Sequence, residues 1–285
     1  MNNLPTTKQN SDLALKRARN LISITNSLLS KKDDKWIEKL LNWADKNNIP
    51  NYEWVEDKDS DEGGYYNGIP QDINTLMKLK TLRLDNLHIE YLPREFFNLL
   101  QLEEIHIKNS KLKILSSEIK NLQNLQVLYL AENELSELPN ELKYLIKLTR
   151  LHLHTNNFKE FPKVLCNIPF LNHICISSNK IKTLPLQLFN SKFLKELALD
   201  NNKLNNIPKE IEQLVNLEYF KIHGNRIKKL PIEIIQLKNL IFLSLDKDSY
   251  NETFFDEFCS HNLPHVLNVE NITLMFNEAI VKFNQ

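Results

Sequence analysis

The sequence contains few of the residues on which several common kinds of site depend. It has four glycines and three cysteines among 285 residues. So few glycines leave no place for the Gly-rich loop that cradles a phosphate, and neither a nucleophile elbow nor a metalloprotease helix motif is present. Three scattered cysteines do not form a disulfide framework, which favours a reducing compartment. We therefore predict that the chain is not an enzyme and holds no cofactor.

The chain also lacks net charge and long apolar runs. Its 36 Lys and Arg residues balance 36 Asp and Glu residues, which argues against broad attraction to nucleic acid or anionic membranes. No stretch approaches the roughly 18 apolar residues of a membrane span. The start of the chain lacks the apolar core of a secretory signal. We expect a cytoplasmic protein, and export by a specialised bacterial secretion system stays compatible with the sequence.

The chain does have an internal repeat. Eight leucines follow one another at intervals of 23 residues, and a nearly identical apolar pattern follows each of them. Self-similarity at a fixed period of this length is the signature of a repeat architecture. We call each repeat a coil and number the coils 1 to 8 by their first leucines, which are Leu79, Leu102, Leu125, Leu148, Leu171, Leu194, Leu217 and Leu240.

Each coil shows two periods. Leu128 and Leu130 alternate with other residues, as in a short strand with one buried face. After Leu138 and Pro139 the apolar residues are spaced by three or four, which favours a single helical or 3₁₀ turn. One such unit cannot bury its apolar side alone, so the coils must stack with their strands in parallel. The predicted product is an α/β solenoid.

These motifs resemble the leucine-rich repeat family, in its 23-residue class with Leu-Pro at the midpoint, which is common in bacterial and signalling proteins. The resemblance covers residues 79 to 250. It implies a right-handed curved solenoid with a parallel concave β-sheet and short helical or 3₁₀ turns on the convex side. In this family a ninth-position Asn bridges buried backbone groups of adjacent coils. Here these residues are Asn133, Asn156, Asn179, Asn202 and Asn225.

Some coils depart from the family pattern. The ninth position is Leu87 in coil 1, Ser110 in coil 2 and Asp248 in coil 8, and Ser116 replaces the proline of coil 2. We expect looser or irregular backbone bonding at the three ninth positions. Neither kind of change threatens the fold.

The ends of a solenoid expose apolar faces that need covers. Residues 1–55 are predicted to be an N-terminal helical cap, with apolar stripes over 12–29 and 34–46 and with Trp54 packed between this helical pair and coil 1. Residues 254–285 are predicted to be a C-terminal helical cap, with a stripe over 270–283. Alternatively, the N-terminal helices form a separate partner-binding module. The solenoid between the caps is predicted over 56–253, with a half repeat over 56–78, full repeats starting at 79, 102, 125, 148, 171, 194 and 217, and a last partial repeat from 240.

The acidic run over 57–63 is similar to the start of a calcium loop. The sixth place requires Gly and holds Glu62, and the twelfth requires Glu and holds Gly68. We interpret the run as a solvated linker into coil 1, and a weak cation site is the alternative.

The surface of the predicted sheet carries the candidate binding residues. Positions three, five, seven and eight of each coil are predicted to point to the concave side, and positions four and six into the core. The residue types vary at the concave positions, whereas they barely vary at the core positions. Aromatic and Arg side chains are the usual anchors of protein interfaces. The candidate partner-binding residues are Arg83, His106, Tyr129, Arg150, His152, His154, His173, Cys175, Tyr219, Lys221, His223 and Phe242.

Five of these residues are histidines, which allows three further hypotheses. His152 and His173 beside Cys175 could supply zinc ligands or activate the thiol. Zinc would lack its usual ligand spacing, and an open sheet offers no pocket that excludes water. Imidazoles that titrate near pH 6.5 could instead make binding sensitive to pH. We predict no metal site and no catalytic residue.

The sequence therefore predicts a non-catalytic protein–protein interaction module that binds a protein or peptide on its concave sheet, with no nucleic-acid partner. A bacterial effector that engages a host protein through the same face is one alternative. A structural or self-assembling spacer is another, although a monomer is favoured.

Overall fold

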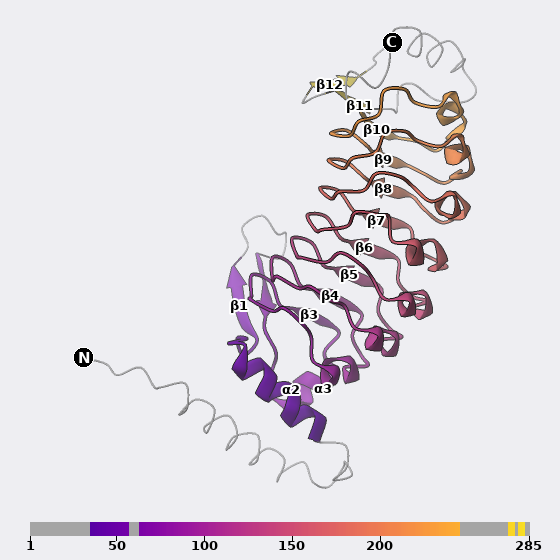
Figure 1. Cartoon of the computed structure of the whole chain (residues 1–285). Coiled ribbons are helices and arrows are strands. Elements are labelled where there is room, and N and C mark those ends of the chain that lie inside the picture. Colours follow the sequence, from indigo (N-terminus) through magenta and orange to yellow (C-terminus); the bar gives the residue numbers. More distant parts are fainter. Residues whose placement is uncertain (1–34, 57–62, 246–272, 277–278, 283–285) are drawn as a thin grey trace.

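The computed structural model describes residues 35–56, 63–245, 273–276 and 279–282. The repeats form a curved solenoid in which the sheet lies on the inner side of the arc and the 3₁₀ helices lie on the outer side (Figure 1). This arrangement confirms the predicted α/β solenoid.

Each of the eight coils contributes one short strand to the sheet. Adjacent strands pair in parallel, and residues 23 positions apart face each other without a shift of register. The sequence period is therefore also the spatial period of the sheet. The strands are β3 (Thr81–Arg83), β4 (Glu104–His106), β5 (Val127–Tyr129), β6 (Arg150–His152), β7 (His173–Cys175), β8 (Glu196–Ala198), β9 (Tyr219–Lys221) and β10 (Phe242–Leu245).

A 3₁₀ helix follows each strand from β3 to β9. Proline precedes six of these helices because its fixed φ suits the start of a helical turn, as at Pro139 with φ −68°. In coil 2 the hydroxyl of Ser116 instead accepts a hydrogen bond from the backbone N–H of Glu118 and so caps the helix. The helices are η1 (Arg94–Asn98), η2 (Ser117–Asn121), η3 (Asn140–Tyr144), η4 (Lys163–Asn167), η5 (Leu186–Asn190), η6 (Lys209–Gln213) and η7 (Ile232–Gln236).

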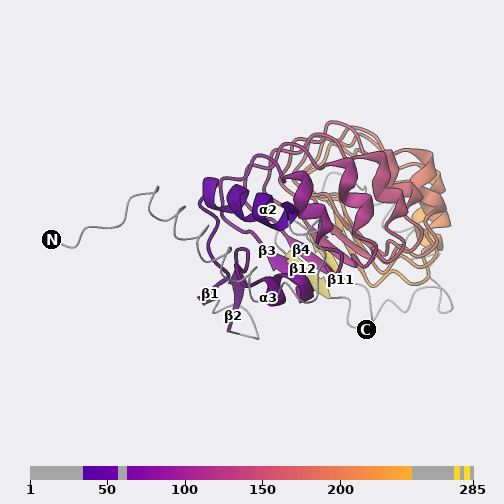
Figure 2. The same ribbon diagram turned by 90° about the horizontal axis from the view of Figure 1, so that it is seen from below.

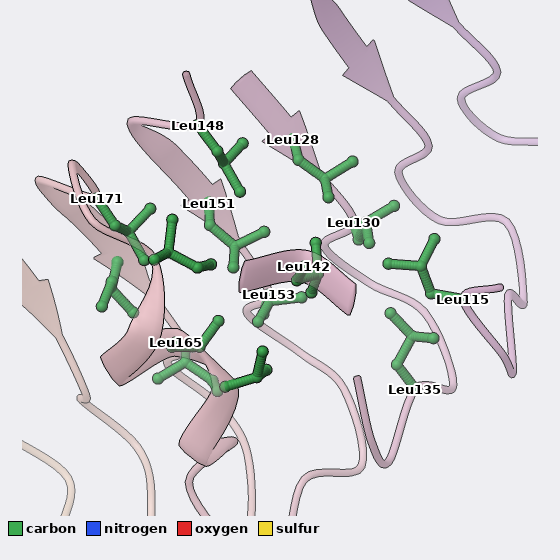
Figure 3. Close-up of a cluster of buried hydrophobic side chains, with 14 of the residues drawn as sticks. Leu115, Leu128, Leu130, Leu135, Leu142, Leu148, Leu151, Leu153, Leu165 and Leu171 are labelled. Atoms are coloured by element: carbon green, nitrogen blue, oxygen red, sulfur yellow. The ribbon is translucent and has the colours of Figure 1, made fainter. Parts of the chain in front are cut away.

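The repeated leucines and isoleucines fill one continuous core between the sheet and the 3₁₀ helices. Leu128, Leu130 and Leu142 are each 0% exposed. Leu128 and Leu130 approach from the strand side and Leu142 from the helical side, beside the leucines of the next coil (Figure 3). Because every coil buries its apolar residues against its neighbours, the fold depends on stacking rather than on any single coil.

The ninth-position asparagines form a ladder of buried hydrogen bonds between coils. The side-chain nitrogen of Asn156 donates to the carbonyl of Leu130 at 2.8 Å, and its oxygen accepts from the N–H of Leu135 at 2.9 Å. Each bond satisfies a backbone group of the preceding coil that the sheet does not pair. The same bridge occurs at Asn133, Asn179, Asn202 and Asn225.

The ladder also continues through the departures in coils 1 and 2. The hydroxyl of Ser110 donates to the carbonyl of Leu84 at 2.8 Å and accepts from the N–H of Leu87 at 3.2 Å. Asn67, which precedes coil 1, accepts from the N–H of Asp85 at 2.9 Å and donates to its carbonyl at 3.1 Å. The bonding at Leu87 and Ser110 is therefore irregular, as expected, but it is not looser. The Ser110 hydroxyl bonds the N–H of Leu87 instead of the N–H two positions further on, and Asn67 bonds the backbone of Asp85. Asp248 lies outside the described residues.

A helix and a hairpin cover the N-terminal end of the solenoid. Helix α2 (Lys35–Lys46) buries Leu40 and Trp43 and contacts η1, and a short helix α3 (Ile73–Lys78) precedes coil 1. The antiparallel hairpin of β1 (Glu53–Glu56) and β2 (Gly64–Asn67) lies beside them (Figure 2). Helix α2 falls within the predicted second helix at 34–46. The predicted helix over 12–29 and most of the acidic run at 57–63 lie outside the described residues.

The prediction for Trp54 is wrong. Its side chain is 51% exposed and packs edge-on against Tyr66, at 5.1 Å between ring centroids, rather than between helices and coil 1. The reason is that Trp54 and Tyr66 are paired residues of the β1–β2 hairpin, so they share its exposed face.

The prediction of a C-terminal helix over 270–283 is also wrong for the residues described there. Strand β11 (Thr273–Phe276) pairs in parallel with β10, and β12 (Ala279–Lys282) pairs antiparallel with β11. The sheet therefore has ten strands in the described part of the chain. Without β11, the backbone groups of β10 on that side would form an unpaired edge, so strand addition covers the end of the solenoid through backbone hydrogen bonds.

In the described part of the chain, no helix has the length and apolar character needed to cross a membrane.

Candidate functional site

The register of the sheet places the candidate residues in straight columns on its inner face. The fifth-position column runs through Arg83, His106, Tyr129, His152 and Cys175, each paired with the next across adjacent strands. Neighbouring strands are about 4.8 Å apart, so planar side chains in one column come to stacking distance.

Four aromatic rings in the middle of this face form a continuous stack. The ring centroids of His106 and Tyr129 are 4.4 Å apart and those of Tyr129 and His152 are 4.0 Å apart, each pair at an interplanar angle of 14°. His173, in the third-position column of the next strand, extends the stack at 4.6 Å from His152 with a tilt of 35°. We call these four residues the ring stack. Each ring is therefore restrained by its neighbours in the stack.

Arginines border the ring stack. The guanidinium of Arg83 lies over the ring of Tyr65, at 4.6 Å from its centroid, which links the column to β2 of the N-terminal hairpin. Arg150 is exposed and pairs in register with Val127 and His173. Tyr65 was not among the candidate residues, because the hairpin that carries it has no counterpart in the repeat.

Burial keeps two imidazoles of the ring stack, those of His106 and His152, neutral at physiological pH. Loss of solvent, with the nearby charges of Arg83 and Arg150, lowers the pKa of His106 to about 3. Loss of solvent, with the neighbouring His173 and His154, lowers the pKa of His152 to about 3. Burial also lowers the pKa of His154. The hypothesis of a binding face that gains charge near pH 6 is therefore wrong for His106 and His152.

One atom of the ring stack carries an energetic cost. The Nε2 atom of His152 is buried and has no hydrogen-bond partner among the described residues. A buried polar atom without a partner typically costs about 1–3 kcal/mol. His152 is therefore less favourable for stability at this position than an apolar ring of similar shape would be.

The next coils change the character of the inner face from rings to ion pairs. Nδ1 of His173 lies 3.0 Å from Oε2 of Glu196, and Oε1 of Glu196 lies 3.1 Å from Nζ of Lys221. The hydrogen bond from His173, supported by Lys221, lowers the pKa of Glu196 to about 2 despite its partial burial. We call Glu196, Asp200, Lys221 and His223 the ionic cluster.

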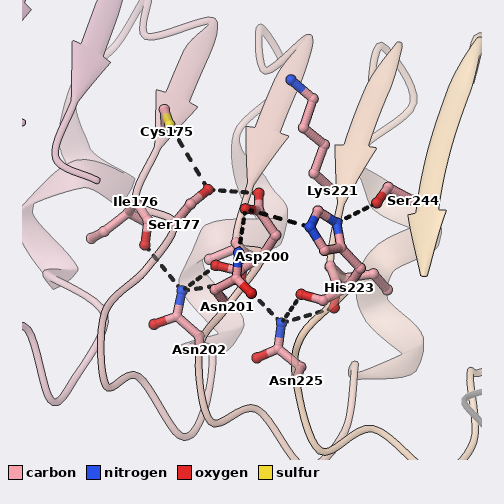
Figure 4. A network of polar contacts seen from close by, with 12 residues as sticks. Cys175, Ile176, Ser177, Asp200, Asn201, Asn202, Lys221, His223, Asn225 and Ser244 are labelled. Carbon is pink, nitrogen blue, oxygen red and sulfur yellow. Dashed lines mark hydrogen bonds and ion pairs between the residues drawn. The ribbon is translucent and has the colours of Figure 1, made fainter. Parts of the chain in front are cut away.

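The seventh-position residues continue the ionic cluster (Figure 4). Oγ of Ser177 donates to Oδ1 of Asp200 at 2.6 Å, and Oδ2 of Asp200 lies 3.9 Å from Nε2 of His223. His223 is also hydrogen-bonded to Ser244 through Nδ1. This Ser, His and Asp arrangement does not present a nucleophile, because Ser244 is only 2% exposed.

The thiol of Cys175 is not activated. Burial raises its pKa, and its hydrogen-bonding neighbour is the hydroxyl of Ser177, with 3.9 Å between sulfur and oxygen. The hypothesis of a thiolate prepared by His152 or His173 is therefore wrong. His152 and His173 face each other as rings, and among the residues that the structure describes no group of three His, Cys, Asp or Glu side chains is arranged to hold a metal ion.

The remaining candidates lie on the same face but apart from the ring stack. Tyr219 and Phe242 neighbour each other at 6.4 Å between centroids. This pair borders the ionic cluster, because Tyr219 shares β9 with Lys221 and pairs in register with Glu196. His154 follows two residues after His152, in the seventh-position column. Its Nδ1 atom lies 3.4 Å from Oγ1 of Thr155. The structure thus gathers His106, Tyr129, His152 and His173 into one unit and leaves Tyr219 and Phe242 as a separate pair.

Comparison with known proteins identifies the repeats. Two family models described as leucine-rich repeats match residues 169–227 and 124–145. No curated protein matches the chain.

Several solved structures share the fold. A leucine-rich repeat protein of Leptospira interrogans is 28% identical, with a TM-score of 0.58 over 73% of this chain and 62% of that one. An internalin of Listeria monocytogenes is 22% identical, with a TM-score of 0.56 over 70% of this chain and 54% of that one. The plant peptide hormone receptor RGFR1 in complex with RGF2 is 21% identical, with a TM-score of 0.54 over 73% of this chain and 33% of that one. The chain thus spans less than two thirds of each of these proteins.

Proposed function

Because the chain is a leucine-rich repeat protein, we propose that it is a non-catalytic module that binds a protein or peptide on the inner face of its sheet. The observation that carries this proposal is the ring stack of His106, Tyr129, His152 and His173. A solved structure of similar fold is a plant peptide hormone receptor in complex with RGF2, which supports a peptide partner for this fold.

The ring stack has the properties of an interface anchor. Binding costs free energy when side chains lose rotamer freedom, so rings that already restrain one another bind at a lower cost. Tyrosine presents an apolar ring and a polar hydroxyl, and Arg150 next to the stack adds a charged donor. His106 and His152 are neutral at physiological pH, so the stack offers aromatic surface without buried positive charge.

The unpaired Nε2 atom of His152 further supports a role in binding. Residues kept at a cost in stability are commonly found at functional sites. The asparagine ladder pairs backbone groups below the stack, and the unpaired atom of His152 lies at the face on which we place the partner. The other such atom among the described residues, Nε1 of Trp43, lies in helix α2.

Selection from a displayed peptide library tests the proposal. Peptides selected on the wild-type protein should bind Tyr129→Ala at least about 30-fold more weakly, because loss of an interface anchor typically costs 2 kcal/mol or more. The matched control is Tyr144→Ala, since Tyr144 is 52% exposed on η3 at the outer side of the arc. Equal binding to both variants, or a loss confined to Tyr144→Ala, would reject the inner face.

A self-assembling spacer would behave differently in solution. A module that binds a separate partner should remain a monomer, whereas a spacer should grow with concentration. Static light scattering over a hundredfold range of concentration, together with the Tyr129→Ala variant, separates the two. Growth in mass that this substitution abolishes would assign the ring stack to self-association instead.

A further inference from the structure

A groove with a strong positive charge runs along one edge of the solenoid, where each coil leaves the sheet toward its 3₁₀ helix. Residues from coils 4, 5 and 6 line it, between β6 and η4, between β7 and η5, and after β8. Its floor includes Phe161 and Leu184, which are 3% and 7% exposed. The charged residues along its walls are Lys159, Lys163, Lys180, Lys182, Lys203 and Glu160. We call these residues the basic groove.

One acid, Glu160, lines the basic groove together with five lysines, so most of their positive charge is uncompensated. Lys159 and Lys182 occupy the same place in adjacent coils, as do Lys180 and Lys203. Like charges therefore neighbour one another along the edge, and none of the five lysines forms an ion pair with a carboxylate of the described residues. Lys180 instead donates to the side-chain oxygen of Asn157 at 2.8 Å.

The same edge is compensated in the N-terminal coils. Lys113 of coil 2 stands at the repeat position of Lys159 and Lys182, and it pairs with Glu90 of coil 1 at 2.9 Å. At this position Lys159 of coil 4 and Lys182 of coil 5 have no such ion-pair partner among the described residues. Repulsion between neighbouring lysines is unfavourable for folding, so a role in attraction of an anionic partner accounts for it better than a structural role.

We propose that the basic groove binds an acidic segment of a partner protein, a run of Asp and Glu residues in extended form. The ammonium groups of lysine are flexible point charges, which suit carboxylates spread along a chain without a fixed geometry. A hollow surface that crosses adjacent coils suits a chain better than a flat surface. This second site lies on the edge of the solenoid, and so the proposal is independent of the partner on the inner face.

The composition of the groove disfavours other anionic partners. Single-stranded nucleic acid is usually held by exposed aromatic rings on which bases stack, and the only aromatic residue of the groove lining, Phe161, is buried. No arginine lines the groove to grip a phosphate with two parallel hydrogen bonds. The groove is also hollowed, whereas a membrane presents a flat array of headgroups.

Fluorescence anisotropy with a labelled ten-residue glutamate peptide and the full-length chain tests the proposal. At low ionic strength we expect saturable binding that the double substitution Lys180→Gln and Lys182→Gln weakens about tenfold. Salt near 0.3 M should weaken wild-type binding by a similar factor, since the charges are exposed and screened.

The matched control is the double substitution Lys111→Gln and Lys113→Gln. These residues occupy the same repeat positions three coils earlier, and their loss changes the net charge equally. Binding by this control should stay within about twofold of wild type. An equal loss of peptide binding in both variants would show that the total charge of the protein alone attracts the peptide. It would overturn the proposal that the basic groove is the binding site.

Two further outcomes would also overturn the proposal. One is the absence of saturable binding to the glutamate peptide. The other is tighter binding to a ten-nucleotide poly(dT) or to vesicles with 30% phosphatidylserine, with a loss of that binding in Lys180→Gln, Lys182→Gln. The latter result would assign the groove to nucleic acid or to membranes.

Discussion

The two parts of the inner face use the same backbone for different chemistry. In coils 2 to 5 the ring stack packs aromatic surfaces against one another at 4.0 to 4.6 Å. In coils 6 and 7 the ionic cluster joins Glu196 to Lys221 at 3.1 Å and leaves Asp200 and His223 at 3.9 Å. His173 of the ring stack connects the two parts, since its ring contacts His152 and its Nδ1 atom is hydrogen-bonded to Glu196 of the ionic cluster.

This contrast shows how a repeat separates scaffold from surface. The asparagine ladder and the leucine core are alike below both parts, so the strand spacing is the same. Planar rings at that spacing stack, whereas charged side chains of opposite sign pair. His106 is buried and the other three rings are half-buried. Packing between rings should respond little to salt, whereas the charges of the ionic cluster are partly solvated and screened. We expect the ring stack to supply affinity and the ionic cluster to supply selectivity.

The largest expected effect tests the claim that the scaffold is the same in both parts. Asn156 lies below the ring stack and Asn202 lies below the ionic cluster. Substitution of either residue by Ala removes hydrogen bonds to two or more buried backbone groups. Each should lower the free energy of unfolding by about 2–4 kcal/mol, as measured by urea denaturation. Values that differ by more than about 1.5 kcal/mol would show that the scaffold differs between the two parts.

Acid should weaken the ring stack first. His106 and His152 have pKa values of about 3 in the folded protein and near 6.5 when unfolded. As pH falls below about 6.5, the unfolded chain takes up protons that the folded chain does not, so stability falls until about pH 3. The slope is at most about 1.4 kcal/mol per pH unit for each imidazole.

His152→Phe isolates one of these contributions. Phenylalanine keeps a planar ring in the stack and cannot titrate, so the fall in stability between pH 6 and pH 4 should become shallower. Urea denaturation at pH 7, 6, 5 and 4 measures it. An unchanged slope in the variant would mean that His152 is protonated in the folded protein.

The ionic cluster should respond in a lower pH range. The pKa of Glu196 is about 2 when folded, compared with about 4.5 for a free side chain. Its contribution to stability is therefore present above about pH 4.5 and is lost as pH falls toward 2. Glu196→Gln should cost below about 1 kcal/mol at pH 7, because the pair is partly solvated. It should leave the slope between pH 6 and pH 5 as in wild type, and a change there would contradict the separation of the two parts.

The smallest effects are the pairwise coupling energies. A double-mutant cycle on Tyr129 and His152 should give about 0.5–1.5 kcal/mol that 1 M salt leaves unchanged. A cycle on Glu196 and Lys221 should give about 0.2–1 kcal/mol that the same salt removes. Thermal or urea unfolding of the single and double variants measures both, and salt sensitivity of the first pair would argue against a stack of neutral rings.

The repeat period predicted most of the fold and the columns of the inner face. Residues 23 positions apart share a column, so the neighbourhood of His106, Tyr129 and His152 followed from counting. The lowered pKa values of the two imidazoles did not follow, because they depend on how far the rings bury one another. Tyr65 was missed because it belongs to a hairpin outside the repeat.

The ends of the solenoid were predicted less well, since no repeat constrains them. Apolar residues over 270–283 fit a helical stripe, but Thr273, Ile280 and Val281 are β-branched and the neighbouring strand β10 offers an open edge. The basic groove was missed for a different reason. The whole chain sums to zero net charge, and only a count by repeat position separates the lysines of coils 4 to 6 from the paired Lys113 and Glu90.

Site-specific photo-crosslinking tests the central claim most directly. A benzophenone amino acid placed at Arg150, beside the ring stack, is compared with the same amino acid at Tyr144 on the outer side of the arc, each with a peptide selected on the wild-type protein. We predict a crosslinked peptide at position 150 and none at position 144. Crosslinking at 144 with none at 150 would contradict a partner on the inner face.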